Sequence, residues 1–381
     1  MATTAKLVVK DQDPLAALQE FLKAVLKLGE ASAVLVAHNL PGQRAIMPTL
    51  VTAPDKIDGA DPLAPVFPIN AARLASRLTR KPLGGKVAAV LRPCEIRAFI
   101  ELVKLKQGRM EEVLLVGTDC LGAYSNMNYP RFAGETGRES TLSFYRNIMA
   151  GKGTACADFD LSPACKACEH PIPENTDLLI GVVGVDITKE LLVKANTAAG
   201  EALLAKLGLP AGEEPHGREE EIKALLARRL AYRDQMFKET GEATGDLVKL
   251  MNYLANCVNC YNCRVACPVC YCRECVFVTD VFDHEPSQYL RWAKRKGIIK
   301  MPTDTIFYHI TRLAHMSTAC IGCGQCSNAC PNNVPVMELF RTLASVTQRA
   351  FEYEAGRSLQ DEPPLSVFRE KEFSEVTGGK D

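Results

Sequence analysis

The sequence predicts an α/β N-terminal domain, a parallel or mixed sheet with helices, followed by a mostly α-helical domain. In the first half, apolar runs of strand length alternate with helical segments, which is typical of βαβ units. In the second half, helix-forming segments flank two copies of one closely spaced cysteine pattern. The 381 residues are enough for two or three domains of ordinary size. We divide them into an α/β domain (1–210), a helical linker (211–250), a cysteine-rich helical domain (251–360) and a tail (361–381).

The α/β domain begins with an amphipathic helix at residues 13–30. Its leucines recur at helical spacing, Asp13 is placed as the cap, and Pro14 stands in the first turn. A strand, a βαβ unit with its helix, and a third apolar strand are then expected at residues 31–39, 86–91, 94–107, 111–117 and 177–185.

Residues 187–210 complete the domain, and the Gly- and Pro-containing segment 210–217 marks a surface boundary. One or two helices in residues 219–257 lead into the first cysteine motif. Between the two motifs we expect a helical insertion, with a basic stretch (291–300) and an apolar segment (304–316). The basic stretch is interpreted as a solvated helix face, with docking of an acidic partner as the alternative.

The cysteine motif has the spacing of bacterial ferredoxins, Cys-x2-Cys-x2-Cys-x3-Cys-Pro. In that pattern three cysteines hold one [4Fe-4S] cluster, and the fourth, before the proline, holds the neighbouring cluster. The sequence therefore predicts two clusters and an electron carrier. The ligands expected for one cluster are Cys257, Cys260, Cys263 and Cys330, and those for the other are Cys320, Cys323, Cys326 and Cys267.

The cluster loops need backbone that closes tightly around the inorganic core. Gly322 and Gly324 serve this in the second loop, since glycine adopts positive φ without strain. In the first loop we expect Asn259 and Asn262 to take that role, because asparagine tolerates the left-handed region. Zinc sites are disfavoured, because zinc ribbons use two separated cysteine pairs.

The overall composition excludes several classes of function. Lys plus Arg and Asp plus Glu both number 45, so the chain lacks the basic excess of a general nucleic-acid binder. No run of 18 apolar residues predicts a transmembrane segment, and no apolar stretch at the N-terminus predicts a signal peptide. We expect a protein of a reducing, anaerobic cytoplasm, where its 16 cysteines stay free of disulfides.

Four more cysteines lie near the ends of the predicted strands. Cys94 and Cys120 follow two of them, and the pair Cys165 and Cys168 precedes the third. Ligands of open α/β sheets bind beyond the carboxyl ends of the strands, so these thiols are expected to converge. They suit a third cluster, while zinc binding, redox activity or a structural role for the pair stays open.

Three segments of this domain resemble the coenzyme F420 hydrogenase/dehydrogenase beta-subunit family, which includes formate dehydrogenase beta subunits. They are VLRPCEIRAFIELVKLKQ, LLVGTDCLGAY and ACKACEHPIPENTDLLIGVVG, and the resemblance covers roughly residues 85–205. It strengthens the prediction of a third [4Fe-4S] cluster on the four N-terminal cysteines. Some members of this family also carry a two-cluster ferredoxin module beside this domain.

The resemblance also implies a cofactor and partners. Family members bind a flavin, commonly FAD, that accepts hydride from reduced F420. Where the family often has a Gly-Asp pair, this chain reads Gly181-Val182-Val183-Gly184. The implied partner is a catalytic oxidoreductase subunit, namely formate dehydrogenase, hydrogenase or a heterodisulfide-reductase-like complex.

Our hypothesis is an iron–sulfur electron-transfer subunit of an anaerobic oxidoreductase, with F420 or NAD(P)H dehydrogenase activity if flavin is bound. The alternative is a flavin-free ferredoxin-type adaptor without a substrate of its own.

Other residues carry less information. No Ser/His/Asp set, HExxH, P-loop or GxGxxG is present, so no catalytic residue is predicted. His309 and His315 are expected to pack or to face solvent. The surplus thiols Cys270, Cys272 and Cys275, with Cys156, are interpreted either as one further metal site or as free thiols beside a cluster.

Overall fold

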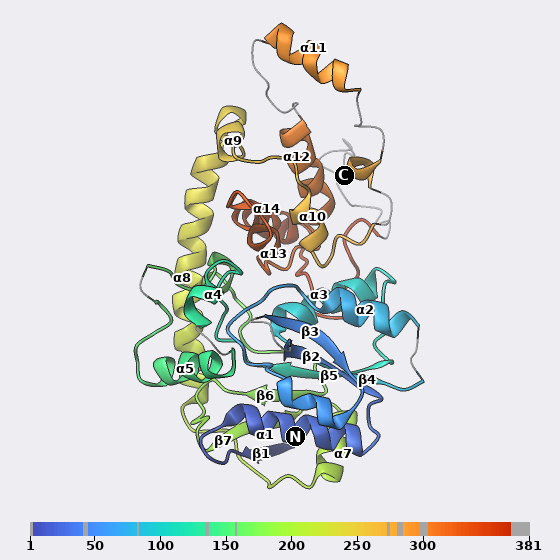
Figure 1. Cartoon of the computed structure of the whole chain (residues 1–381), viewed down its shortest axis with the longest axis vertical. Coiled ribbons are helices and arrows are strands. Elements are labelled where there is room, and N and C mark those ends of the chain that lie inside the picture. Colours follow the sequence, from blue (N-terminus) through green and yellow to red (C-terminus); the bar gives the residue numbers. More distant parts are fainter. Residues whose placement is uncertain are drawn as a thin grey trace, which may run out of the picture.

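A computed structural model describes residues 3–40, 45–81, 84–133, 137–156, 158–272, 275–279, 285–296 and 304–366. Its N-terminal part is built on one seven-stranded mixed sheet with the order β1-β7-β6-β5-β4-β2-β3 (Figure 1). The four inner strands β2, β4, β5 and β6 are parallel, and β3, β7 and β1 add antiparallel edges. The strands are β1 (Thr4–Val8), β2 (Ala33–Asn39), β3 (Ile46–Val51), β4 (Val87–Leu91), β5 (Val113–Thr118), β6 (Leu178–Gly181) and β7 (Glu190–Ala195).

Helices cover both faces of this sheet. Ala88 and Val90 of β4 belong to the core that α1, α5 and α7 share, whereas Val87, Ala89 and Leu91 face α2 and α3. A strand buried on both faces reads as a continuous apolar run, which is why β4 and β5 are recognisable in the sequence. The helices of this part are α1 (Pro14–Lys27), η1 (Pro54–Gly59), α2 (Ala72–Arg80), α3 (Pro93–Lys104), α4 (Tyr129–Ala133), α5 (Gly137–Met149), α6 (Pro163–Lys166) and α7 (Ala198–Leu207).

The first helix begins where the sequence predicts. The side chain of Asp13 accepts a hydrogen bond of 3.0 Å from the backbone N–H of Ala16, and Pro14 is the first helical residue. Such a cap satisfies an N–H that the helix itself leaves unpaired.

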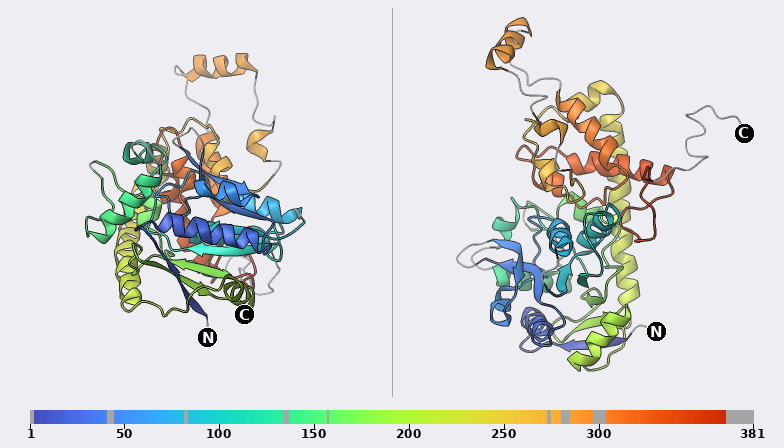
Figure 2. Two further views of the ribbon diagram at one scale, coloured as in Figure 1. Left: turned by 60° about the horizontal axis from the view of Figure 1, so that its bottom comes forward. Right: turned by 90° about the vertical axis from the view of Figure 1, so that its right-hand side faces the viewer.

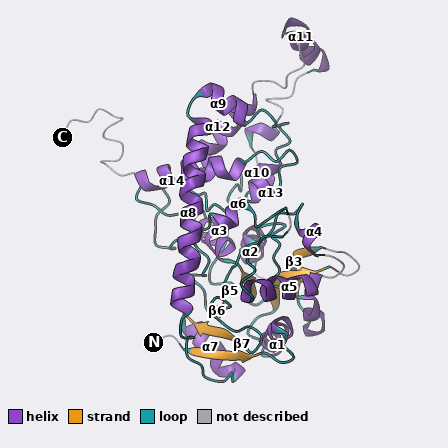
Figure 3. Ribbon diagram, turned by 90° about the vertical axis from the view of Figure 1, so that its left-hand side faces the viewer, coloured by secondary structure: helices purple, strands orange, loops and turns teal. Residues whose placement is uncertain are grey.

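The C-terminal part is helical, and the expected mixed α/β plus helical fold class is confirmed. The long helix α8 (Arg218–Thr244) runs beside both parts of the molecule (Figures 1 and 3). The other helices are α9 (Leu247–Tyr253), α10 (Asn262–Ala266), η2 (Val276–Val278), α11 (Pro286–Lys296), α12 (Asp304–Met316), α13 (Gln325–Asn328) and α14 (Val336–Ala350).

The two parts share one apolar core. Phe99 of α3, Tyr308 of α12 and Phe340 of α14 belong to the same buried cluster. The segment after α14 is fastened to α3 as well: the hydroxyl of Tyr353 and the N–H of Gly356 each donate a 2.6 Å hydrogen bond to Glu101. This contact surface positions the cysteine loops against the carboxyl edge of the sheet.

Several elements were not expected from the sequence. The edge strands β1 and β3 are short and partly exposed, and β7 lies in residues 187–210, for which no strand was specified. Of the basic stretch 291–300, residues 291–296 end α11, where Arg291, Lys294 and Arg295 are exposed, and 297–300 lie outside the described residues. Helix α11 stands away from the rest of the chain (Figure 2). Among the described residues, no helix has the length and apolar character needed to cross a membrane.

Candidate metal centres

The first thiol set consists of Cys257, Cys260, Cys263 and Cys330, which line one small cavity of about 10 Å³. The first three come from the loop that follows α9 and from α10. Cys330 comes from the end of the second motif, 67 residues beyond Cys263 in the sequence, and its charge acts on Cys257 together with those of Cys260 and Cys263. The fold therefore brings the cysteine before Pro331 to the other motif's triplet.

The second thiol set consists of Cys320, Cys323, Cys326 and Cys267. Burial raises the pKa of Cys326 well above its ordinary value, and the charges of Cys267, Cys323 and Cys320 raise it further. These mutual effects place Cys267, from the first motif, among the thiols of the second. Iron ligation by either set stays a prediction.

Both loops turn at equivalent positions, the second and fourth residues after their first cysteine. In the second loop these are Gly322 (φ 71°) and Gly324 (φ 78°), as expected. In the first loop they are Asn259 (φ 51°) and Tyr261 (φ 59°), so the expectation for Asn262 is wrong. Asn262 is instead the first residue of α10.

Two contacts explain the residue types at the fourth position of these loops. The ring of Tyr261 lies 4.8 Å from that of Tyr308, which compensates the strain of a left-handed tyrosine. A Cβ atom on Gly324 would lie 2.4 Å from the Cβ of Ala164 in α6, so the second loop docks closely on the α/β domain.

Helix α12 presents three polar side chains to the first thiol set. Nη1 of Arg312 donates to Sγ of Cys263 at 3.1 Å, the Tyr308 hydroxyl lies 3.3 Å from the same sulfur, and Nε2 of His309 lies 3.4 Å from Sγ of Cys257. Sequence reasoning missed Tyr308 and Arg312 and interpreted His309 as a packing or surface residue. The available signal was an i, i+1, i+4 grouping of polar residues inside an otherwise apolar helix.

The surroundings of Arg312 indicate whether this site suits an anionic cluster. Its side chain is buried, its Nε has no hydrogen-bond partner, and within the described ranges no carboxylate pairs with it. A buried guanidinium needs a compensating negative charge. The nearby sulfur atoms belong to both sets, Cys263 to the first and Cys267 and Cys326 to the second. Thiolates that bind iron supply that charge, so the residues fit two clusters with Arg312 between them.

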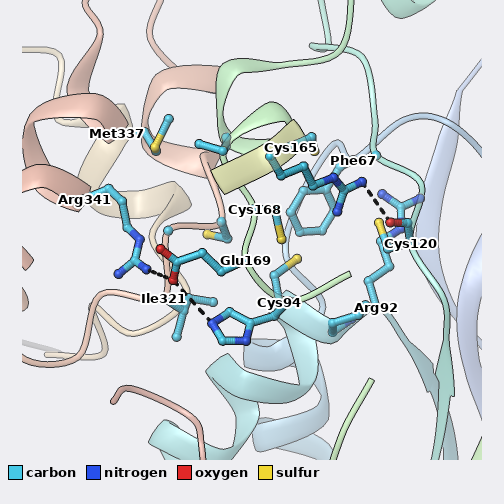
Figure 4. A pocket seen from close by; sticks show the side chains of 18 residues that line it. Phe67, Arg92, Cys94, Cys120, Cys165, Cys168, Glu169, Ile321, Met337 and Arg341 are labelled. Carbon is cyan, nitrogen blue, oxygen red and sulfur yellow. Dashed lines mark hydrogen bonds and ion pairs between the residues drawn. The ribbon is translucent and has the colours of Figure 1, made fainter. Parts of the chain in front are cut away.

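The third thiol set consists of Cys94, Cys120, Cys165 and Cys168, which line a cavity of about 40 Å³ (Figure 4). Cys94 lies in the first turn of α3, directly after β4, and Cys120 follows β5. Cys165 belongs to α6, and its Sγ accepts a 3.3 Å hydrogen bond from the N–H of Ala123. The structure therefore brings together all four cysteines that the strand order predicted to converge; the metal they bind stays a prediction.

A buried ion pair holds the turn that carries Cys120. Asp119 receives hydrogen bonds of 2.6 and 3.1 Å from the guanidinium of Arg218, at the start of α8. It also accepts from the N–H groups of Val182 and Val183, at 2.9 and 3.0 Å. On the same helix, Arg229 donates to the carbonyl of Cys120 at 3.1 Å. Helix α8 therefore fixes the backbone on both sides of the Cys120 thiol.

Burial and neighbouring negative charges disfavour free thiolates in the third thiol set. Burial raises the pKa of Cys120 to about 11, while Arg92 and Arg229 oppose that rise. Burial likewise raises the pKa of Cys94, and the charges of Glu95 and Cys323 raise it further. Thiols must be deprotonated to bind a metal, so a metal bound by this set would have to offset the cost of burying thiolates.

The second and third sets are neighbours. Cys323 of the second set lines the same cavity as the third, and Arg341 of α14 lies on its wall. Arg341 is held by Glu169, the residue after Cys168, at 2.6 Å. The three sets therefore form a continuous series: first, second, third.

The surplus thiols do not occupy one place. Cys156 lies in the turn after α5, where its backbone pairs with Phe159 of the α/β domain. Cys270 lies beside Cys267, and burial raises its pKa to about 11. Cys272 is exposed. In the part of the chain that the structure describes, no three His, Cys, Asp or Glu side chains surround a single metal ion.

The carboxyl edge of the sheet also allows a test for flavin. Besides the thiol-lined cavity, this edge has a cavity of about 20 Å³ near Arg92 and Thr118. Cofactor pockets measure roughly 300–1,000 Å³, so both of these spaces are smaller than a typical flavin site. Val182 and Val183 stand where the family often has an acidic residue. Their N–H groups already donate hydrogen bonds to Asp119.

Comparisons with known proteins match both halves of the chain to described families. Residues 84–209 match the family that covers the C terminus of the coenzyme F420 hydrogenase/dehydrogenase beta subunit. Residues 253–334 match the family described as 4Fe-4S dicluster domain.

Two relatives are similar over most of their length. The chain is 28% identical over 282 residues to the F420-dependent formate dehydrogenase subunit beta of Methanocaldococcus jannaschii, covering 68% of this chain and 70% of that protein. It is 26% identical over 310 residues to the F420-dependent formate dehydrogenase 1 subunit beta of Methanococcus maripaludis, covering 74% of this chain and 75% of that protein. A chain in a solved structure of the F420-reducing [NiFe] hydrogenase complex from Methanosarcina barkeri aligns with a TM-score of 0.46 and 14% identity, over 65% of this chain and 94% of that chain.

Proposed function

We propose that the chain is the electron-transfer subunit of a multi-subunit oxidoreductase, because residues 84–209 match the C terminus of coenzyme F420 hydrogenase/dehydrogenase beta subunits and residues 253–334 match a 4Fe-4S dicluster domain. The observation that carries the proposal is the series of three thiol sets. Arg312 lies between the first and second, and the charge of Cys323 in the second acts on Cys94 in the third. An electron relay requires redox centres that lie next to one another in a series.

We assign one [4Fe-4S] cluster to each thiol set. When bound, the clusters supply one-electron oxidation and reduction. The chain's own residues hold and shield them: the apolar core shared by α3, α12 and α14 excludes water, and buried arginines compensate the negative charge. Iron and sulfide analysis with EPR on the anaerobically reconstituted full-length protein tests the assignment. About twelve irons per chain supports three clusters, and about eight refutes the third.

The partner we propose is a catalytic oxidoreductase subunit, with formate dehydrogenase ahead of hydrogenase, since both relatives are formate dehydrogenase beta subunits. A heterodisulfide-reductase-like complex, in an anaerobic cytoplasm, is the further candidate acceptor. Affinity purification of the tagged chain from its own cells under anaerobic conditions provides the test. Co-purifying formate:viologen activity supports the first choice, and hydrogen:viologen activity alone contradicts it.

A second candidate function is direct oxidation of F420 through a bound flavin, favoured by the names of the relatives. The space at the carboxyl edge of the sheet favours the flavin-free form. Acid release of flavin from the purified protein, together with an F420 reduction assay, separates the two. Stoichiometric flavin with F420 turnover establishes the second function.

A further inference from the structure

A polar cavity of about 290 Å³ lies between α2 and the loop after α10. Arg73, Arg77 and Arg80 line it from α2, where their spacing places them on one helix face. Arg264 lines it from α10, in the cysteine-rich half of the chain. Two parts of the fold thus direct four guanidinium groups at one space, and none of its lining residues is acidic. We call it the arginine cavity.

These arginines lack carboxylate partners among the residues that the structure describes. The hydrogen bonds found for three of them go to neutral oxygens: Arg73 to the carbonyl of Val265 at 2.9 Å, Arg80 to the Gln107 side chain at 3.3 Å, and Arg264 to the carbonyl of Cys272 at 3.3 Å. The Nε of Arg264 is buried without a partner.

Surface arginines elsewhere in this chain behave differently. Arg131 pairs with Asp158 at 2.5 Å, and Arg146 pairs with Glu139 at 2.7 Å. In the arginine cavity the cations instead act on one another: burial and the charge of Arg77 lower the pKa of Arg73, the charges of Cys270 and Cys267 partly oppose this, and Arg264 lowers it further. A multiply charged anion relieves this repulsion.

We propose that the arginine cavity binds a small molecule that carries a pyrophosphate group. The planar guanidinium fork matches phosphate oxygens two at a time, which a point charge does not. The volume lies at the lower end of small-molecule sites, at roughly 300 Å³. Tyr271, also on the wall and 37% exposed, offers a ring face to an aromatic base attached to the phosphates.

The position gives the site a role beside the second thiol set. The charges of Cys270 and Cys267 both act on Arg73. A bound pyrophosphate therefore places negative charge close to the second thiol set, in reach of the redox centre that this set is proposed to hold. The binding proposal itself does not depend on which metal occupies that set.

Calorimetric titration of the full-length, iron-loaded protein with pyrophosphate tests the site. We expect saturable binding that weakens as the salt concentration rises. Arg77→Gln and Arg80→Gln should each weaken it about tenfold, because each removes a charge-assisted hydrogen bond. Both side chains are exposed, so the fold is retained. The matched control is Arg228→Gln, an exposed arginine of α8 that does not line the cavity and should leave binding unchanged.

Two outcomes overturn the proposal. One is the absence of pyrophosphate binding at low salt, or binding that the Arg77→Gln/Arg80→Gln double variant leaves intact. The other is binding of a hexaglutamate peptide without binding of pyrophosphate, which identifies the cavity as the dock of an acidic protein segment instead.

Discussion

Replacing Arg312 by Gln should lower the reduction potential of the cluster held by the first thiol set. Arg312 is 4% exposed, and its Nη1 lies 3.1 Å from Sγ of Cys263. Reduction adds negative charge to the cluster, and a buried cation stabilises that added charge. Glutamine keeps a hydrogen-bond donor, but it removes the positive charge and the guanidinium contact with the ring of Phe340.

The size of the effect follows from the geometry. A full charge at 3.1 Å from the guanidinium, with an effective dielectric constant of about 20, interacts by about 5 kcal/mol. The added electron spreads over the irons and sulfurs, so we take about one third of this value, roughly 2 kcal/mol. At about 59 mV per 1.4 kcal/mol for one electron, the potential should fall by about 80 mV.

EPR-monitored redox titration of the anaerobic full-length protein measures this change. Arg312→Lys, which keeps the charge, should lie closer to the wild type than Arg312→Gln does. Arg349→Gln alters an exposed arginine on neighbouring α14 and serves as the matched control, with no shift expected. A shift below about 20 mV in Arg312→Gln, with the iron content retained, would refute the electrostatic reasoning.

Three further changes test other parts of the structure. Cys94→Ser should reduce the iron content from about twelve to about eight atoms per chain in a colorimetric assay, and an unchanged count would exclude this thiol as a ligand. Arg218→Met leaves the charge of Asp119 buried and unpaired, so the free energy of unfolding measured with denaturant should fall by about 3–5 kcal/mol, and a loss below about 1 kcal/mol would contradict this. Burial raises the pKa of Asp61 from 3.8 to about 6, although Thr141 donates to it. The folded chain therefore binds this proton more tightly than the unfolded chain, and stability should fall as pH rises through that interval, by about 3 kcal/mol in all. Asp61→Asn should remove this part of the pH dependence in thermal unfolding between about pH 3.5 and 6.5; an unaltered pH profile would show that Asp61 does not contribute it.

Local signals in the sequence were enough to predict several elements. The inner strands β4 and β5 are continuous apolar runs because both of their faces are buried. Helix α1 carries its start signal in Asp13 and Pro14. The cysteine triplets are legible because three ligands of one cluster lie within one short loop.

Other features escaped prediction because their cause lies far away in the sequence. The positive φ of Tyr261 is tolerated because its ring contacts that of Tyr308. Tyr308 lies far along the sequence, in α12. Strand β7 pairs with the edge strand β1, nearly the whole domain away in the sequence. In both cases the local sequence around one member of the pair does not indicate where its partner lies.

The sequence by itself determined the kind of protein: two cysteine triplets, four further thiols at strand ends and an α/β frame, all set by local spacing and by alternation of apolar runs. The tertiary structure alone decided the series of the three thiol sets, the buried charge of Arg312 beside two of them, and the arginine cavity between α2 and α10. Hydrogen-bond and ligand spacing act over a few residues and can be read along the chain. Burial and electrostatic compensation act through space, between side chains that only folding brings together.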